Sequence, residues 1–121
     1  MHKITSDRNK NRLIIILEGQ MDSVEAKEAA DEVVQKLEEL NAGMEIINDI
    51  SKFKPSSEEA QNEIIRAQKA AIQKGASRVV RVIGSVIGKT QFKRLQKEAN
   101  ATYEVIEANS MEDAINFLES N

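Results

Sequence analysis

Apolar residues in the first twenty positions form two short groups separated by a polar cluster. His2–Ser6 is predicted to be a short edge strand, and Leu13–Leu17 is a β-branched run typical of a strand buried on both faces. The polar cluster Asp7–Asn11 has the composition of a turn, and Gly19 follows the second run as a stop signal. The pattern therefore predicts a β-hairpin at the start of the chain.

After this hairpin the apolar spacing changes to the three- and four-residue intervals of an amphipathic helix. The expected N-cap is Asp22 or Ser23, and Glu25 stands three residues after Asp22, as in a capping box. The segment Asn41–Gly43 is a helix-stop signal. The side chains expected to face the core recur at helical spacing: Ala26, Ala30, Val33, Leu37 and Leu40.

The middle of the chain repeats the succession of a strand and a helix. Met44–Ile50 predicts a strand, and Ser51–Pro55 predicts a loop. Ser56 or Ser57 is expected to cap a second helix, with Glu59 as the capping-box partner of Ser56. A serine at this position is therefore explained by helix capping alone.

The last part of the chain continues the alternation. Gly75 ends the second helix. A strand is expected at Val79–Ile83, followed by a loop at Gly84–Gly88 and a helix at Thr90–Ala99. The chain then ends with a strand at Tyr103–Ile106 and a helix capped by Asn109 or Ser110. The order β-β-α-β-α-β-α-β-α requires right-handed crossovers and predicts an α/β fold with a single small mixed, mostly parallel sheet. No linker or repeat interrupts it, so residues 1–121 are expected to form one domain.

Composition narrows the class of protein. Apolar residues make up 40% of the chain and charged residues 31%, which is typical of a soluble globular protein. The absence of cysteine excludes disulfides, thiol catalysis and thiolate metal sites. The polar N-terminus does not resemble a signal peptide, and the longest apolar run is far below the ~20 residues of a membrane span. A cytoplasmic location is the expectation.

Charge is unevenly distributed along the chain. Thirteen acidic residues and four lysines lie between Glu18 and Glu63, whereas the stretch from Ile64 to Lys97 holds nine basic residues and no acid. Two interpretations stay open: two solvated faces of opposite bias, or a basic surface for an acidic partner or an anion. No aromatic stacking set accompanies the basic stretch, so nucleic acid is not an expected partner.

The stretch RVIGSVIGKTQF resembles a phosphate-binding loop in the order of its parts. Three residues separate Gly84 from Gly88, one fewer than the G-x-x-x-x-G-K-[ST] pattern requires. The missing residue matters because successive backbone N–H groups must wrap the phosphate. What remains is a hypothesis that Lys89 and the amides near Thr90 hold an anion at a helix N-terminus.

Catalytic constellations are not apparent in the sequence. His2 is the only histidine, which leaves no histidine cluster for a metal and no serine triad. Neighbouring acidic residues fall on predicted helices, where adjacent side chains point apart. Asp49 is the carboxylate of interest, because it lies near the carboxyl end of a central strand, where open α/β sheets place ligands. It is also explained as a turn cap that accepts from the backbone near Ser51. No enzyme and no cofactor are expected.

Three segments resemble the STAS domain of anti-sigma factor antagonists and sulfate-transporter tails. LEGQMD (Leu17–Asp22) resembles the family's strand end and helix start, INDISKFKPSS (Ile47–Ser57) its strand, turn and phosphorylatable serine loop, and SMEDAINFL (Ser110–Leu118) its last helix. The resemblance covers nearly the whole chain and implies a non-enzymatic regulatory module. It implies a kinase-like anti-sigma factor as the partner, which binds the unphosphorylated form.

The resemblance also implies particular residues. The serine phosphorylated in the family corresponds by position to Ser56 or Ser57. The expected partner surface is the Asp49–Ser57 loop, with Asp49, Ser51, Phe53 and Lys54, together with the start of the second helix and the neighbouring third helix. The family pattern Asp-Ser-Ser-Gly is replaced here by Pro-Ser-Ser-Glu-Glu, which lacks the glycine and adds two carboxylates that would repel a phosphate.

A second hypothesis uses the same architecture. Some STAS-like proteins resemble lipid carriers that hold an apolar ligand between helices and sheet. The loop Gly84–Gly88, with Val86 and Ile87, would then gate a pocket for a small apolar ligand or lipid. The alternative explanation for these two side chains is ordinary packing against a neighbouring element.

Overall fold

The computed structural model describes residues 1–54, 57–83, 93–94, 97 and 103–120. Its five-stranded sheet has the order β1-β2-β3-β4-β5. The first two strands are antiparallel, and every later neighbour is parallel. The strands are β1 (His2–Asp7), β2 (Arg12–Gly19), β3 (Glu45–Phe53), β4 (Arg78–Val82) and β5 (Glu104–Ala108). The expected opening hairpin and mostly parallel α/β sheet are confirmed.

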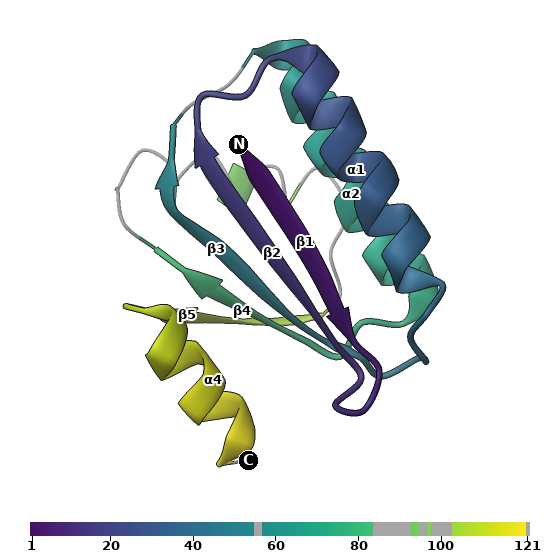
Figure 1. The fold of residues 1–121 in the computed structure, drawn as a ribbon, viewed down its shortest axis with the longest axis vertical. Helices are drawn as coiled ribbons and strands as arrows, with labels where there is room; N and C mark the ends of the chain where they lie inside the picture. The colour runs from purple at the N-terminus through teal and green to yellow at the C-terminus, as the bar shows by residue number, and fades with distance from the viewer. Residues whose placement is uncertain (55–56, 84–92, 95–96, 98–102, 121) are drawn as a thin grey trace.

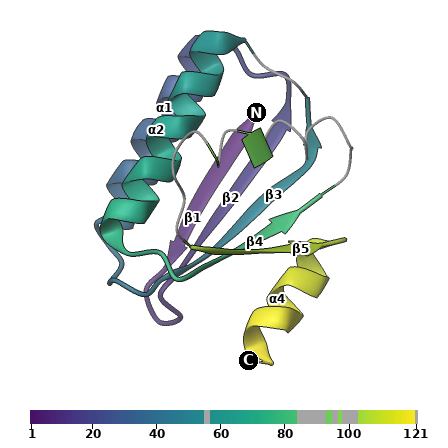
Figure 2. The same ribbon diagram turned by 180° about the vertical axis from the view of Figure 1, so that it is seen from behind.

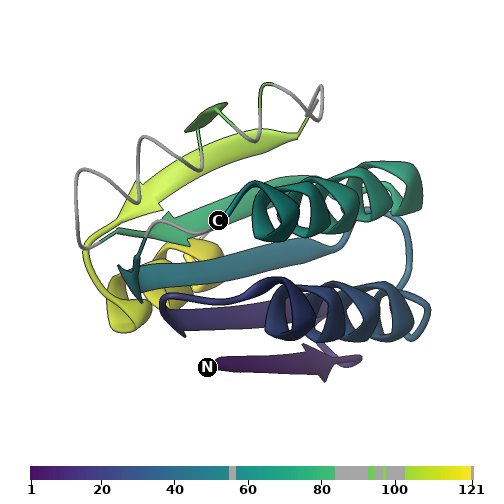
Figure 3. The same ribbon diagram turned by 90° about the horizontal axis from the view of Figure 1, so that it is seen from above.

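Helices cover both faces of this sheet. The helices are α1 (Ser23–Leu37), α2 (Glu58–Lys74) and α4 (Met111–Glu119). Figures 1 and 2 show α1 and α2 packed side by side, and Figure 3, viewed from above, shows α4 on the other side of the strands. The predicted helix Thr90–Ala99 lies largely outside the described residues, of which Lys93, Arg94 and Lys97 are helical. None of the helices in the described part of the chain is long and apolar enough to cross a membrane.

Alternation along the strands divides the core into two clusters. On β3, Ile46 and Ile50 belong to the larger cluster under α1 and α2, whereas Ile47 belongs to the smaller cluster under α4. The smaller cluster also contains Val80 of β4 and Leu118 of α4. All five apolar positions predicted to face the core from the first helix and its end are buried. A period of two on the strands therefore supplies apolar side chains to both helical layers.

Strand β3 is longer than its sequence predicts. The segment Ser51–Pro55 was expected to be a loop, but Ser51, Lys52 and Phe53 continue the strand. The register between β2 and β3 shifts after Ile16, so that Lys52 pairs with Glu18 and Phe53 with the residue after it. The loop prediction is wrong for these residues because this irregular pairing, which depends on the neighbouring strand, satisfies their backbone groups.

Each described helix begins at a polar cap. Asp22 accepts from the Glu25 N–H at 2.8 Å, and Ser110 accepts from the N–H of Asp113 at 3.0 Å. Ser57 caps α2 by accepting from the Ala60 N–H, so the residue three positions after the cap is an alanine. The capping box predicted between Ser56 and Glu59 is therefore wrong, since the helix begins one residue later.

Charged side chains fasten α4 to the amino ends of the strands. Arg12, which is buried in β2, donates to Glu45 at 3.3 Å and to Glu119 at 3.1 Å. Arg78 also donates to Glu45 and lies over the Phe117 ring, 5.6 Å from its centroid. Three neighbouring strands, β2, β3 and β4, and the last helix therefore share one ion-pair network.

A second polar cluster joins β1 to α1. The imidazole Nδ1 of His2 lies 3.0 Å from Glu25, and its Nε2 lies 3.6 Å from Glu32. The hydrogen bond from His2 is the largest cause that lowers the pKa of Glu25 below its ordinary value, with burial acting in the opposite direction. The edge strand is thus connected to the helix that covers it by a side-chain contact as well as by apolar packing.

Candidate functional site

The predicted partner surface lies where β3 ends and α2 begins. Asp49 accepts from the Ser51 N–H at 3.0 Å and from the Ser51 hydroxyl at 2.6 Å. This is the turn-type capping expected for Asp49, although it occurs within the strand. Both side chains are half-buried, and Lys54 is exposed. The hydrogen bond from the Lys54 N–H to the carbonyl of Gly19, at 3.0 Å, holds this end of the strand against β2.

Phe53 does not belong to an exposed surface. Its side chain is 2% exposed and packs in the larger core cluster. The prediction that this residue contacts a partner assumed that it lay in a loop, whereas β3 continues through it and directs its ring inward. Phe53 therefore supports this end of β3 from the core, and its side chain is not part of the exposed surface.

Ser57 lies at the first turn of α2 and is exposed. Its hydroxyl oxygen accepts from the Ala60 N–H at 3.2 Å. Glu58 and Glu59 occupy the first turn beside it and are also exposed. The hydroxyl therefore has a structural role as an N-cap while remaining on the surface. Ser56, the other phosphorylation candidate, lies outside the described residues.

The other predicted ligand-binding positions fall outside the described residues. The anion-site candidates Lys89 and Thr90 lie outside the described residues, as do the loop Gly84–Gly88 and its side chains Val86 and Ile87. Among the residues that are described, no group of three or more histidine or acidic side chains is arranged to hold a metal ion.

The acid-free basic stretch is only partly available as a surface. Arg66 donates to Glu63 at 2.8 Å and to Asp31 at 2.7 Å, and these two partners raise the pKa of its guanidinium. Arg78 is engaged with Glu45, and Arg81 is buried. The members of this stretch that the structure describes as exposed are Lys69, Lys93, Arg94 and Lys97, whereas Lys74 is half-buried. Ion pairs within the protein therefore compensate part of the basic charge that is concentrated in this stretch.

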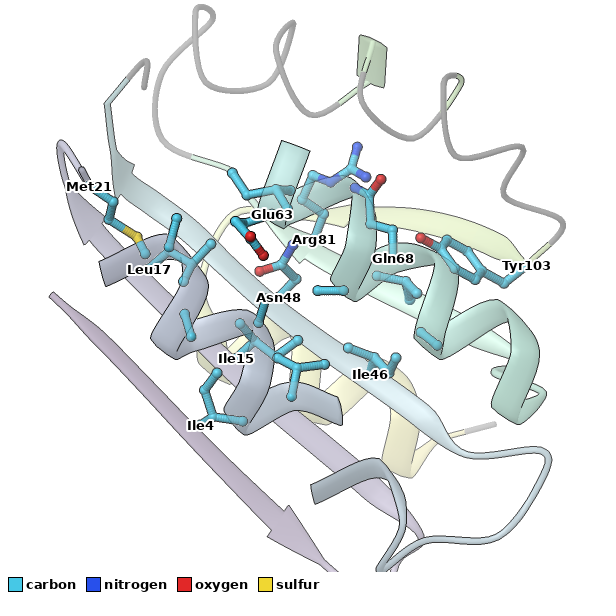
Figure 4. Close-up of a pocket in the computed structure, with 18 residues that line it drawn as sticks. Ile4, Ile15, Leu17, Met21, Ile46, Asn48, Glu63, Gln68, Arg81 and Tyr103 are labelled. Atoms are coloured by element: carbon cyan, nitrogen blue, oxygen red, sulfur yellow. The ribbon is translucent and has the colours of Figure 1, made fainter. Parts of the chain in front are cut away.

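A cavity of about 60 Å³ lies between the sheet and the α1–α2 layer. Figure 4 shows apolar side chains on its side near β1 and β2, among them Ile4, Ile15 and Leu17. The polar side chains of the lining come from the other strands, from α2 and from the residue before β5: Asn48, Glu63, Gln68, Arg81 and Tyr103. The cavity is thus apolar at one end and polar at the other.

The register of the sheet places the polar residues together. Asn48 of β3 is the direct partner of Arg81 on β4, and Arg81 is in turn the partner of Glu107 on β5. Arg81 is only 1% exposed. Burial lowers its pKa, an effect that the nearby charges of Tyr103 and Glu107 partly offset, and burial also raises the pKa of the Tyr103 hydroxyl. The polar end of the cavity therefore contains a positive charge in a desolvated environment.

A pocket between the helices and the sheet was expected only under the lipid-carrier hypothesis, and the polar side chains that line this cavity were not predicted. A signal for this polar lining exists, because Asn48 directly follows two isoleucines and Arg81 lies between two valines, and a polar residue in a buried run is more informative than an apolar one. The contribution of Gln68 had no such signal, since glutamine on an amphipathic helix is ordinarily on the solvent side.

Comparison with solved structures identifies the fold. The anti-sigma factor antagonist SpoIIAA in its unphosphorylated form matches with a TM-score of 0.68 and 11% identity over 100% of both chains. A DUF3478-family protein from Shewanella loihica with a SpoIIAA-like fold matches with a TM-score of 0.67 and 16% identity, over 98% of this chain and 95% of that one.

A third structure, an anti-sigma factor antagonist from Mycobacterium paratuberculosis, has a TM-score of 0.59 and 11% identity, again over 98% of this chain and 95% of that one. No protein-family model matches the sequence, and no curated protein matches it significantly. The chain has the SpoIIAA-like fold, which is the STAS fold expected from its sequence motifs.

Proposed function

We propose that this chain is a regulatory interaction module that works as an anti-sigma factor antagonist does, by binding a protein partner in the cytoplasm and not by catalysis. The fold supports this proposal, because two of the similar structures are anti-sigma factor antagonists. The observation that carries it furthest is the position of Ser57, exposed at the first turn of α2 and close in sequence to the exposed Lys54. By resemblance, the partner is a kinase-like anti-sigma factor.

The proposed docking surface is the end of β3 together with the first turn of α2. The contact between Asp49 and Ser51 shapes the strand end, and the buried ring of Phe53 anchors it. Lys54, Ser57 and their acidic neighbours supply the exposed polar groups. A surface with a rigid base and a polar rim suits reversible association with another protein.

Phosphorylation of Ser57 is the proposed switch, with Ser56 as the alternative position. A phosphate adds about −1.5 to −2 charges at neutral pH and would meet the free N–H groups of the helix N-terminus. It would also stand beside Glu58 and Glu59, which are exposed and acidic. The combined negative charge would convert a mixed surface into a strongly acidic one, which gives a partner a basis for distinguishing the two forms.

The test has two steps. The chain is first used to capture a partner from extracts of its source organism, and the purified partner is then titrated by calorimetry against wild type, Lys54→Glu and Ser57→Glu. We expect both substitutions to weaken binding by roughly tenfold or more, as for a lost charge-assisted contact or a like-charge juxtaposition. The matched control is Lys69→Glu, which makes the same charge change on the exposed face of α2, away from its first turn.

Incubation of the complex with ATP, followed by phosphopeptide mapping, tests the switch separately. If binding is insensitive to both substitutions, the docking surface is wrong. If binding is sensitive but neither Ser56 nor Ser57 gains phosphate, the interaction module stands and the switch does not.

The lipid-carrier hypothesis is not favoured by the described residues. Pockets for drug-sized ligands occupy about 300–1,000 Å³, whereas the cavity between the sheet and the helices measures about 60 Å³. A lipid chain would not fit this volume.

A further inference from the structure

Strand β1 forms an open edge of the sheet. Among the described strands it pairs with β2 alone, and Figure 3 shows it at the lower border of the sheet, beyond α1 and on the side away from β5. The backbone groups along such an edge are able to bond to a further strand. Natural edge strands usually carry charges or other features that prevent this pairing, so the side chains of β1 determine which strand the edge accepts.

The hydrogen bonds between β1 and β2 show which backbone groups of the edge point outward. Met1 and Glu18 lie opposite each other and exchange both of their backbone hydrogen bonds, at 2.8 and 2.9 Å. In an antiparallel pair, such positions alternate with positions whose N–H and C=O point to the other side of the strand. The even-numbered residues of β1 therefore turn their backbone groups away from β2, and among them are Ile4 and Ser6.

The side chains of β1 alternate between the two faces of the sheet. Ile4 is buried in the larger core cluster, beneath the α1–α2 layer. Lys3, Thr5 and Asp7 therefore lie on the opposite face, where the first two are exposed and Asp7 is half-buried. Within the described part of the chain, neither Lys3 nor Asp7 takes part in an ion pair. One face of the edge thus carries a cation and an anion, each lacking a counter-charge there.

A second copy of β1 matches this edge in charge. Two antiparallel copies can pair only where even-numbered residues oppose even-numbered residues, because these carry the outward backbone groups. When Thr5 lies opposite Thr5 of the second copy, Lys3 lies opposite Asp7 and Asp7 opposite Lys3. Ile4 and Ser6 of the two chains then exchange backbone hydrogen bonds in both directions. Opposite charges and paired threonines directly across a strand pair are both stabilising.

The other registers of the same two strands lack this match. The two nearest allowed registers place Lys3 or Asp7 opposite Thr5, which leaves the charges without partners. The registers beyond these place Lys3 opposite Lys3 or Asp7 opposite Asp7, and like charges directly opposite each other are destabilising. The position of the two charges therefore selects the register centred on Thr5.

Helix α1 leaves space for a second copy at this edge. Figure 3 shows α1 in front of β2, so that β1 lies between the helix and the border of the sheet. In a continuous sheet the α1 helices of two copies would be three strand spacings apart, which is about 14 Å. Packed helices require only about 8–10 Å between their axes, so the two helices would not collide.

We infer that the chain forms a two-fold symmetric dimer in which the β1 edges pair antiparallel about Thr5 and join the two sheets. This inference goes beyond the proposed function, because the docking surface proposed there lies at the end of β3 and the first turn of α2. The edge is a strand of 6 residues. The interface is therefore small, and we expect a reversible dimer with a dissociation constant in the micromolar-to-millimolar range.

Analytical ultracentrifugation of the full chain at concentrations up to about 1 mM measures this equilibrium. Lys3→Asp and Asp7→Lys each place like charges opposite each other, and we expect each to weaken dimerisation by roughly tenfold. The double variant Lys3→Asp/Asp7→Lys exchanges the two charges and should restore the affinity of the wild type. Lys69→Asp is the matched control, because it makes the same charge change at an exposed position of α2 and should leave the equilibrium unchanged.

A mixture of the two single variants tests the register directly. Only the mixed dimer of Lys3→Asp with Asp7→Lys places opposite charges against each other at both ends of the strand pair. Native mass spectrometry should therefore show the mixed dimer in excess over either homodimer.

Backbone amide exchange locates the interface within the strand. The amides of Ile4 and Ser6 should become protected as the protein concentration rises, because the second copy supplies their acceptors. The amides of Lys3 and Thr5 already bond to β2 and should be protected at every concentration.

Three results would overturn the inference. A chain that stays monomeric at about 1 mM would exclude the dimer. A dimer that both single substitutions leave unchanged would form through another surface. Weakened dimerisation in the single variants, without recovery in the double variant and with folding verified by circular dichroism, would contradict the register centred on Thr5.

Discussion

Arg12 and Glu119 are 107 residues apart in the sequence, yet the guanidinium Nη1 of one lies 3.1 Å from the carboxylate Oε1 of the other. Arg12 is buried in β2, and Glu119 is the last residue of α4. The pair therefore connects the second strand to the end of the last helix. Arg12 also forms an ion pair with Glu45, which is in turn paired with Arg78.

This network predicts unequal effects for its members. Arg12→Leu should lower the free energy of unfolding by about 2–4 kcal/mol, because it leaves the half-buried carboxylate of Glu45 with one cation in place of two. Glu119→Gln should have a much smaller effect, since its carboxylate is largely exposed. Urea unfolding of the two variants measures the difference, and equal losses would show that burial does not determine the strength of this network.

The N-cap of α2 allows stability to be separated from modification. Ser57→Ala should lower the free energy of unfolding by about 1 kcal/mol, because the Ala60 N–H loses its acceptor. Ser57→Asn should be nearly neutral, since asparagine is an equally good N-cap. Asparagine cannot be phosphorylated on a hydroxyl, so Ser57→Asn is also the stable variant in which any switch at this position is absent. A loss as large as that of Ser57→Ala would mean that the cap geometry requires a hydroxyl.

Gly75 provides a comparison of two backbone positions. It ends α2 at a φ of 96°, and an added Cβ would lie 3.2 Å from the Cβ of Ala42. Gly43 has a similar φ of 90°, but an added Cβ there would meet nothing within 4 Å. Both substitutions to alanine incur the left-handed strain of about 1–2 kcal/mol. We therefore expect Gly75→Ala to be the more destabilising of the two in thermal unfolding, and the reverse order would exclude the contact with Ala42 as a constraint.

The contact between His2 and Glu25 predicts a pH dependence on the acid side. Because the folded state lowers the pKa of Glu25, the stability it contributes is complete above the ordinary glutamate value of 4.5 and is lost as the pH falls through the lower folded value. Glu25→Gln should therefore reduce the difference in unfolding free energy between pH 6 and pH 3. The control is Glu28→Gln, which removes a carboxylate from an exposed position of the same helix. An identical pH profile for both variants would contradict the role of His2.

Much of the architecture could be predicted because it depends on local spacing. The β-branched run in β2 and the three- and four-residue intervals in α1 reflect which side chains face the core, and both elements appear where these patterns place them. The end of β3 was missed for a non-local reason. Ser51, Lys52 and Phe53 precede a proline and serines, and only the shifted pairing with β2 makes them a strand.

The candidate sites also combine local contacts, which the sequence could predict, with long-range contacts, which it could not. Capping by Ser57 and the bond from Ser51 to Asp49 are local contacts, and the sequence was sufficient to propose them. The meeting of Asn48 with Arg81 depends on the register between two strands separated by a helix, which no spacing rule specifies. The presence of Gln68 above them depends on how α2 is rotated on the sheet.

The two helical layers differ greatly in the number of buried apolar side chains that pack beneath them. In the described residues the cluster under α1 and α2 contains seventeen buried side chains, whereas the cluster under α4 contains five. Local unfolding begins where few apolar contacts must be broken. Helix α4 is therefore the element whose amides should exchange with deuterium first, ahead of the sheet itself. Transient detachment of α4 would expose Ile47 and Val80, which are fully buried in the folded state. The protein would begin to aggregate on heating through this short-lived apolar surface.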